Sequence, residues 1–308
     1  MLNTPILFLI FNRPDTTKKV FAAIRKAKPQ KLYVAADGPR YEKSGEEANV
    51  REVRAIATNV DWECEVKTLF REQNLGCKMG VSTAITWFFE NEDEGIILED
   101  DCVPDPSFFP FCQELLIRYQ QDNRVMMISG NNFQNGKRRT DYSYYFSRHA
   151  HCWGWATWKR AWKHWNGDLA TWPEVKAANF LDDIAGGDEA FVAYWSRIFD
   201  KCYAGRIDSW AYPWTYSCWI EAGLTILPNT NLVSNIGFGE EATHTKKQNN
   251  KVANLPTFKI GFPLRHPPYM IRDSIADLNT DKKNFGISAP TPSMTCRLLQ
   301  KLERKVCH

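Results

Sequence analysis

Five short apolar runs alternate with amphipathic segments along the first 130 residues, and this alternation restricts the fold more than any other feature of the sequence. The runs are PILFLIF (5–11), KLYVAAD (31–37), CEVKTLF (64–70), GIIL (95–98) and VMMISG (125–130). Before the fourth run, apolar residues recur at helical spacing, at Val81, Ala84, Ile85, Phe88 and Phe89. This alternation predicts an α/β fold with a mostly parallel, Rossmann-like sheet flanked by helices on both faces. Ligands of such sheets bind beyond the carboxyl ends of the strands.

Length and composition indicate the domain organisation. The 308 residues are 44% hydrophobic, which is enough to bury a sizeable core. No linker divides residues 1–253, so we expect a single domain with a regular half (1–130) and a Trp-rich half (131–253). Residues 254–308 are polar and rich in proline, and we expect them to form a C-terminal extension.

Charge and cysteine usage limit the partners and the compartment. The net charge of +3 is small and the basic residues are dispersed, so nothing indicates nucleic acid as a partner. The nine cysteines are scattered without a CxxC pair, which favours reduced thiols in a cytosol. The run PILFLIF is too short to span a bilayer. These features predict a cytoplasmic protein.

Polar residues collect at the predicted carboxyl ends of the strands. They are Asn12, Arg13, Asp37, Gly38, Arg71 and the acidic triplet Glu99, Asp100 and Asp101. Adjacent carboxylates repel by about 1 kcal/mol per close pair in water and by up to about 4 kcal/mol near a protein surface. A divalent cation such as Mg²⁺ or Mn²⁺ would compensate this charge, because it prefers oxygen ligands. A helix cap by Asp105 or Ser107 is the alternative, but a cap needs one acid and the triplet offers three.

Eight segments follow one another between residues 5 and 245: FNRP, VAADG, LGCKMGVSTAITWFF, ILEDDCVPDPSFFPFC, ISGNN, CWGWATWKRAW, DSWAYPW and LVSNIGFGEEATHT. In this order they resemble the nucleotide-sugar glycosyltransferases of GT-A fold, in particular the N-acetylglucosaminyltransferase I group and bacterial relatives found with polysaccharide genes. The resemblance implies an inverting glycosyltransferase that uses Mn²⁺ or Mg²⁺. It would move a sugar from a nucleotide diphosphate, a UDP-sugar such as UDP-GlcNAc, to a glycan hydroxyl in bacterial surface polysaccharide synthesis. The Trp-rich half would bind the acceptor.

The resemblance also assigns roles to residues at the strand ends. Asp101 would contact the metal, while Glu99 and Asp100 would face the sugar and the ribose. Arg13 and Asp37 would hold the nucleotide, and the chemistry agrees, since a guanidinium suits an anionic ligand and a carboxylate can accept the N–H of uracil. The alternative for Arg13 is an exposed loop arginine, and the alternative for Asp37 is an ordinary turn residue in the sequence DGP. Three further residues are expected to bind the nucleotide sugar: Asn12, Lys78 and Gly154, the last in a turn under the donor sugar.

An inverting transfer needs a carboxylate that takes the proton of the acceptor hydroxyl. By resemblance this base lies in the segment DSWAYPW, where the only acid is Asp208. Asp188 and Glu189 compete for the role, with helix capping as their alternative. The resemblance also suggests His244 as a metal ligand, although a surface loop histidine fits the sequence equally well.

Two segments outside these motifs predict helices. Trp155, Trp158 and Trp162 follow at helical spacing and predict a helix buried on one face, with core packing as the role of most tryptophans. The final segment CRLLQKLERKVCH (296–308) also has helical spacing. It would either pack on the domain or rest on the inner face of an anionic membrane, where a lipid-linked glycan acceptor would be presented.

Two other functions remain open at the level of sequence. A sugar nucleotidyltransferase shares the parallel sheet and the metal acids but should carry a Gly-rich phosphate loop near its N-terminus. The first loop, LIFNRPDTTKK, contains no glycine. A non-catalytic glycan-binding module would use the tryptophans and bind neither nucleotide nor metal.

Overall fold

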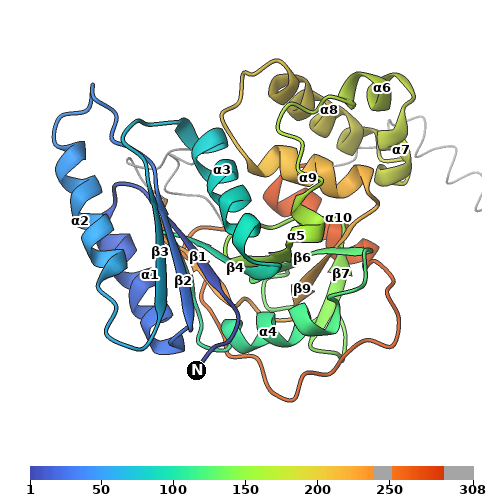
Figure 1. Ribbon diagram of the computed structural model, residues 1–308. Coiled ribbons are helices and arrows are strands. Elements are labelled where there is room, and N and C mark those ends of the chain that lie inside the picture. The colour runs from blue at the N-terminus through green and yellow to red at the C-terminus, as the bar shows by residue number, and fades with distance from the viewer. Residues whose placement is uncertain (239–251, 288–308) are drawn as a thin grey trace, which may run out of the picture.

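The computed structural model describes residues 1–238 and 252–287 (Figure 1). Its strands are β1 (Ile6–Ile10), β2 (Lys31–Ala36), β3 (Glu65–Phe70), β4 (Glu94–Glu99), β5 (Cys102–Pro104), β6 (Val125–Ser129), β7 (Tyr144–Ser147), β8 (Trp155–Trp158), β9 (Leu224–Pro228) and β10 (Val233–Asn235). Its helices are α1 (Pro14–Ala27), α2 (Glu46–Thr58), α3 (Gly76–Asn91), α4 (Phe108–Arg118), α5 (Lys159–Trp162), α6 (Trp172–Ala177), α7 (Phe180–Ala185), α8 (Glu189–Tyr203), α9 (Ala211–Ile220) and α10 (Ser274–Asn284).

Eight strands form one central sheet in the order β3-β2-β1-β4-β8-β6-β9-β7. The first four strands are parallel, β8 is antiparallel to both of its neighbours, and β7 is antiparallel to β9. This arrangement confirms the predicted α/β fold with a mostly parallel, Rossmann-like sheet, and it is consistent with the GT-A type. Strands β10 and β5 form a separate antiparallel pair beside the end of β4.

Alternating residues of the strands supply two cores, one on each face of the sheet. On β1, Ile6 and Phe8 belong to a core that includes residues of α1, α2 and α4. Leu7 and Leu9 belong to the other core, which includes residues of α3, α8 and α9. Because helices cover both faces, the strands are apolar on both sides, and this is why they appear in the sequence as continuous apolar runs.

The prediction of a helix through Trp155 and Trp158 was wrong, because these residues form strand β8 inside the sheet. Trp155 lies in the same core as α3, while Trp158 lies in the opposite core with Ala156. In a strand that is covered on both faces every residue is buried, so the tryptophan spacing could not distinguish strand from helix. Only Trp162, in the short helix α5, is helical as predicted.

Residues 252–287 pack against the domain that they follow. Ile260 and Leu264 join the core on the α1 face, and Ile287 joins the core on the α3 face. Helix α10 lies next to β7, and the helices α6, α7 and α8 gather at one end of the molecule, above α9 in Figure 1. Within the described residues, no helix is long and apolar enough to cross a membrane. The predicted C-terminal helix at 296–308 lies outside the described residues.

Candidate functional site

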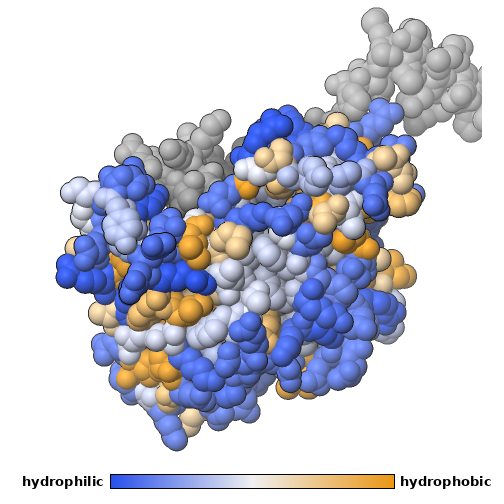
Figure 2. All heavy atoms as spheres, turned by 45° about the horizontal axis from the view of Figure 1, so that its top comes forward, coloured by the Kyte–Doolittle hydropathy of each residue, from blue (hydrophilic) through white to orange (hydrophobic). Residues whose placement is uncertain are grey.

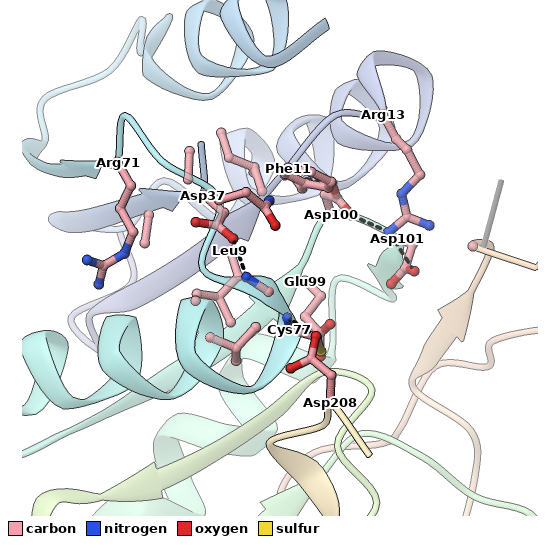
Figure 3. A pocket seen from close by; sticks show the side chains of 18 of the residues that line it. Leu9, Phe11, Arg13, Asp37, Arg71, Cys77, Glu99, Asp100, Asp101 and Asp208 are labelled. Carbon is pink, nitrogen blue, oxygen red and sulfur yellow. Dashed lines mark hydrogen bonds and ion pairs between the residues drawn. The ribbon is translucent and has the colours of Figure 1, made fainter. Parts of the chain in front are cut away.

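A cavity of about 360 Å³ opens at the carboxyl ends of β1 to β4 (Figure 3). This volume is within the range of about 300 to 1,000 Å³ that is typical of small-molecule sites. Five carboxylates and three guanidiniums line the cavity, an excess of two negative charges when all are ionised. They belong to Asp37, Glu99, Asp100, Asp101 and Asp208, and to Arg13, Arg40 and Arg71. The cavity is therefore a polar ligand site at the sheet edge where the sequence predicts one.

Figure 2 turns the upper end of Figure 1 toward the viewer. Hydrophilic residues cover most of the outer parts of this face, and residues of intermediate hydropathy lie between them. Within the cavity, Figure 3 shows Arg71 and Asp37 toward one end, and Arg13 and Asp101 toward the other. A ligand that fills the cavity would thus meet different groups at its two ends.

Arg13 compensates two of the three acids at the end of β4. Its Nη2 atom lies 2.5 Å from Asp100 Oδ1 and 3.0 Å from Asp101 Oδ2. The backbone N–H of Phe11 donates to the other oxygen of Asp100 at 3.0 Å. Burial raises the pKa of Asp100, and the charge of Arg13 opposes this rise. The predicted nucleotide-binding arginine therefore offsets part of the negative charge of Asp100 and Asp101.

We expect Arg13→Ala to lower the free energy of unfolding by about 2 to 3 kcal/mol. Removing one partner of a buried ion pair typically costs about 3 to 5 kcal/mol, and the 22% exposure of the Arg13 side chain reduces this cost. Urea denaturation at neutral pH measures the loss. Arg51→Ala, which removes an exposed arginine of α2, is the control. A loss no larger than that of the control would show that the pair contributes nothing to stability.

Glu99 lies between the other acids of the cavity, close to Cys77 and Asp208 in Figure 3. Its carboxyl group forms no hydrogen bond with any residue that the structure describes. Burial and the charges of Asp101 and Asp100 raise the pKa of Glu99 to about 8. The same surroundings raise the pKa of the Cys77 thiol to about 12, chiefly through burial. Glu99 is thus protonated more readily than an exposed glutamate, and its protonated carboxyl group can donate a hydrogen bond to a ligand.

The segment after β10 lies directly against Asp101. The Nδ2 atom of Asn235 is 3.4 Å from Asp101 Oδ1, and a Cβ atom on Gly237 would lie 2.0 Å from Asp101 Oδ2. Only glycine fits at position 237 without displacing the carboxylate. Among residues 1–238 and 252–287, no group of three or more His, Cys, Asp or Glu residues is arranged to hold a metal ion. His244 lies outside the described residues.

Two carboxylates hold the first turn of α3. Asp37 Oδ2 accepts the backbone N–H groups of Leu75 at 2.9 Å and Gly76 at 3.2 Å. Asp208 accepts those of Cys77 and Lys78, each at 2.8 Å. Burial raises the pKa of Asp37, and its backbone hydrogen bonds oppose this rise. The structure therefore brings the predicted nucleotide-binding aspartate and the predicted base to the same helix terminus.

The other predicted site residues do not line the cavity. The Nδ2 atom of Asn12 donates to Glu46 at 2.7 Å. The ammonium group of Lys78 lies 3.1 Å from Asp168. A Cβ atom on Gly154 would lie 2.7 Å from Val233, and the φ of +66° at this position is one that residues with side chains rarely adopt.

The two alternatives to Asp208 also lie away from the cavity wall. Asp188 caps α8 by accepting the N–H groups of Ala190 and Phe191. Glu189 is exposed in the first turn of the same helix. Asp188 thus has the capping role that the sequence left open as its alternative.

The sequence did not identify Arg40, Trp153 and Phe238 as residues of this site. Arg40 lines the cavity, and its Nε atom donates a hydrogen bond to Glu46 Oε2 at 3.0 Å. Trp153 and Phe238 contact each other at 5.5 Å between ring centroids, in the wall next to the acids. Sequence left open which tryptophan is accessible to a ligand, because Trp153 differs from its neighbours only in its tertiary contacts.

Comparisons with known proteins identify no family for the chain. No family model and no curated protein matches it. Three solved structures align with about half of the chain. HddC from Yersinia pseudotuberculosis has 8% identity and a TM-score of 0.31, with 51% of this chain and 77% of that chain covered. UDP-glucose pyrophosphorylase in complex with UDP-glucose has 11% identity and a TM-score of 0.27, with 47% of this chain and 62% of that chain covered. Residues 1–349 of TarS from S. aureus have 8% identity and a TM-score of 0.34, with 51% of this chain and 47% of that chain covered.

The chain spans less than two thirds of the last two proteins. Similarity at this level carries no argument about function.

Proposed function

We propose that the protein is an inverting, metal-dependent glycosyltransferase that moves a sugar from a nucleotide diphosphate, most simply a UDP-sugar, to a hydroxyl group of a glycan. One observation carries the proposal: acids at the end of β4 and an acid from the Trp-rich half, Asp208, line one cavity at the carboxyl ends of the strands. The resemblance of the sequence motifs to GT-A glycosyltransferases supports the same activity.

The two ends of the cavity suit the two ends of a nucleotide sugar. The guanidinium of Arg71, at the end near Asp37, donates one hydrogen bond, from Nη2 to Thr83 Oγ1 at 2.7 Å, and forms no ion pair with a carboxylate of the described residues. Its remaining N–H groups can donate to a nucleobase or ribose. The acids near Arg13 then lie where the diphosphate and the sugar would follow.

The residues present fit a divalent cation that takes most of its ligands from the substrate. Mg²⁺ usually binds proteins through one or two carboxylates together with phosphate oxygens and water. Asp101 supplies a carboxylate at the cavity wall, and the excess of negative charge favours a cation. Asp101 would hold the ion, and Arg13 would have to exchange its contact with Asp101 for one with the diphosphate. A bound cation would stabilise the negative charge that develops on the leaving diphosphate.

Asp208 is proposed to act as the general base. The acceptor oxygen attacks the anomeric carbon, its proton passes to the Asp208 carboxylate, and the bond from the anomeric carbon to the diphosphate oxygen breaks. The electron pair of that bond leaves with the nucleoside diphosphate. The N–H groups of Cys77 and Lys78 orient the base, because each of its oxygens accepts one of them and keeps a further lone pair free.

Calorimetric titration with UDP tests the proposal. We expect binding in the presence of Mn²⁺ and binding at least about tenfold weaker after chelation, since the ion links the ligand to the acids. A screen of nucleotide sugars for slow hydrolysis would then identify the donor. Binding of free glycans without any response to UDP would instead indicate a glycan-binding module. Formation of a nucleotide sugar from a nucleoside triphosphate and a sugar phosphate would indicate a nucleotidyltransferase.

We expect Arg71→Ala to weaken UDP binding by about 1 to 3 kcal/mol, because hydrogen bonds from a charged group are lost. The dependence on Mn²⁺ should not change, because Arg71 lies at the end of the cavity away from Asp101. Titrations with and without Mn²⁺ measure both effects. Arg51→Ala on α2 serves as the matched control for loss of a positive charge. Equal UDP affinity in Arg71→Ala and the control would remove Arg71 from the site.

A further inference from the structure

Four backbone N–H groups at the start of α3 have no hydrogen-bond acceptor within the helix, as at every helix N-terminus. They belong to Leu75, Gly76, Cys77 and Lys78. In many helices a side chain just before the first turn accepts one or two of them. Leu75 occupies the capping position of α3, and its side chain has no polar atom that could accept a hydrogen bond. The four donors must therefore find acceptors elsewhere in the molecule.

Two carboxylates from distant parts of the chain divide these donors between them. Asp37, after β2, accepts the first two, and Asp208, before α9, accepts the last two. Residues 77 and 208 are 131 positions apart in the sequence. By contrast, α8 and α10 are capped from within their own segments, by Asp188 and Asp273. The start of α3 is thus held jointly by both halves of the domain.

Two glycines allow the carboxylates to approach this turn. A Cβ atom on Gly76 would lie 2.7 Å from Asp208 Oδ2, and its φ of +79° is one that residues with side chains rarely adopt. A Cβ atom on Gly80 would lie 3.0 Å from Asp37 Oδ2. Both glycines also line the cavity, together with Cys77. The turn that the two acids hold is therefore part of the cavity wall.

We propose that Asp208, in addition to its role as a base, is a positioning residue that clamps the first turn of α3 together with Asp37. A residue of the Trp-rich half thereby sets the shape of the part of the cavity that the regular half forms for the nucleotide. The two roles make different predictions. A residue that acts only as a base affects the transfer step and leaves the binding of nucleotide without acceptor unchanged. A clamp also affects nucleotide binding, because part of the wall moves when the turn is released.

Residue-resolved amide hydrogen exchange tests the clamp directly. In Asp208→Asn the side chain offers one acceptor oxygen in place of two, so at least one of the two N–H groups loses its partner. We expect exchange at Cys77 and Lys78 to accelerate by about five- to tenfold, as the loss of a helix cap implies, with little change in the core strands. Asp168→Asn is the matched control, since this exposed acid contacts the ammonium of Lys78 and not the backbone. Unchanged exchange at both amides would overturn the clamp.

UDP titration in the absence of acceptor tests the effect on the cavity. This arm rests on the proposed function, whereas the exchange experiment does not. We expect Asp208→Asn to bind UDP about three- to tenfold more weakly than the wild type, with affinity recovered in part by Asp208→Glu, which keeps both oxygens. Unchanged UDP affinity together with faster exchange would overturn the influence on the cavity. A wild type that binds no nucleotide would contradict the proposed function instead, and exchange would still decide the clamp.

If Asp208→Asn fails to fold, exchange in Asp208→Glu decides the question. The longer side chain keeps the charge but shifts the carboxylate by one methylene group, against the turn that Asp208 already approaches closely at Gly76. We expect changes in exchange confined to Cys77 and Lys78. Changes spread over the whole of α3, or none at all, would contradict a clamp on its first turn.

Discussion

Replacing Asp101 by asparagine is expected to abolish metal-dependent binding of a nucleotide diphosphate while the fold stays intact. The substitution removes a ligand charge from the cavity wall, and even changes to groups that only support metal ligands cost about 10- to 100-fold in affinity. We therefore expect UDP affinity in Mn²⁺ to fall by more than about 100-fold. The fold should survive because Arg13 keeps its contact with Asp100 at 2.5 Å.

Calorimetric titration of UDP in Mn²⁺ and after chelation measures this effect. Asp168→Asn, which neutralises an exposed acid away from the cavity wall, is the matched control. In Asp101→Asn the two titrations should give the same weak affinity, since the ion no longer contributes. UDP affinity equal to that of the wild type in Mn²⁺ would refute the assignment of Asp101 to the metal.

The second large effect concerns α10 and stability. Asp281, on this helix, is buried; it lies 2.6 Å from Arg148 Nη2 and 3.1 Å from His149 Nε2. The guanidinium of Arg148 also lies 3.9 Å from the ring centroid of Phe191 on α8. Asp281→Ala would leave the buried Arg148 without its counter-ion. We expect the free energy of unfolding at neutral pH to fall by about 3 to 5 kcal/mol.

Denaturant unfolding measures this loss, and Asp273→Ala is the matched control. Asp273 caps the same helix and pairs with Arg139, but both side chains of this pair are partly exposed. Its removal should cost about 0.5 to 2 kcal/mol, as expected for a helix cap. If Asp281→Ala cost no more than Asp273→Ala, the buried pair would not be what attaches α10 to the domain.

The contribution of Asp281 should also depend on pH. Burial raises its pKa, but the contacts with His149 and Arg148 outweigh burial and leave the pKa below its ordinary value. A carboxyl group whose pKa is lower in the folded state stabilises the protein above its unfolded pKa of about 3.9, and this stability is lost as the pH falls through the folded value. The difference between wild type and Asp281→Ala should therefore be constant near neutrality and shrink below about pH 4.

Local periodicity in the sequence was sufficient to predict the fold class and the edge of the sheet that carries the site. The apolar runs before Asn12, Asp37, Arg71 and Glu99 became four parallel strands whose ends meet, and most of the polar residues that follow them line the cavity. Periodicity failed at Trp155 and Trp158. A short strand covered on both faces has the same apolar composition as a buried helix, so its state was set by the space between β4 and β6.

The sequence determined which charged groups this protein has and at which end of the sheet most of them stand, because these groups directly follow predicted strands and the carboxyl ends of parallel strands lie at one edge of the sheet. Only the tertiary structure decided which of these groups are paired. Arg13 pairs with Asp100, which lies 87 positions away in the sequence. Asp208 holds the first turn of α3 across 130 positions or more, and Arg148 pairs with Asp281 across 133. Whether a carboxylate binds a ligand, caps a helix or neutralises an arginine depends on the groups that folding brings within about 3 Å of it, since hydrogen bonds act only over that range.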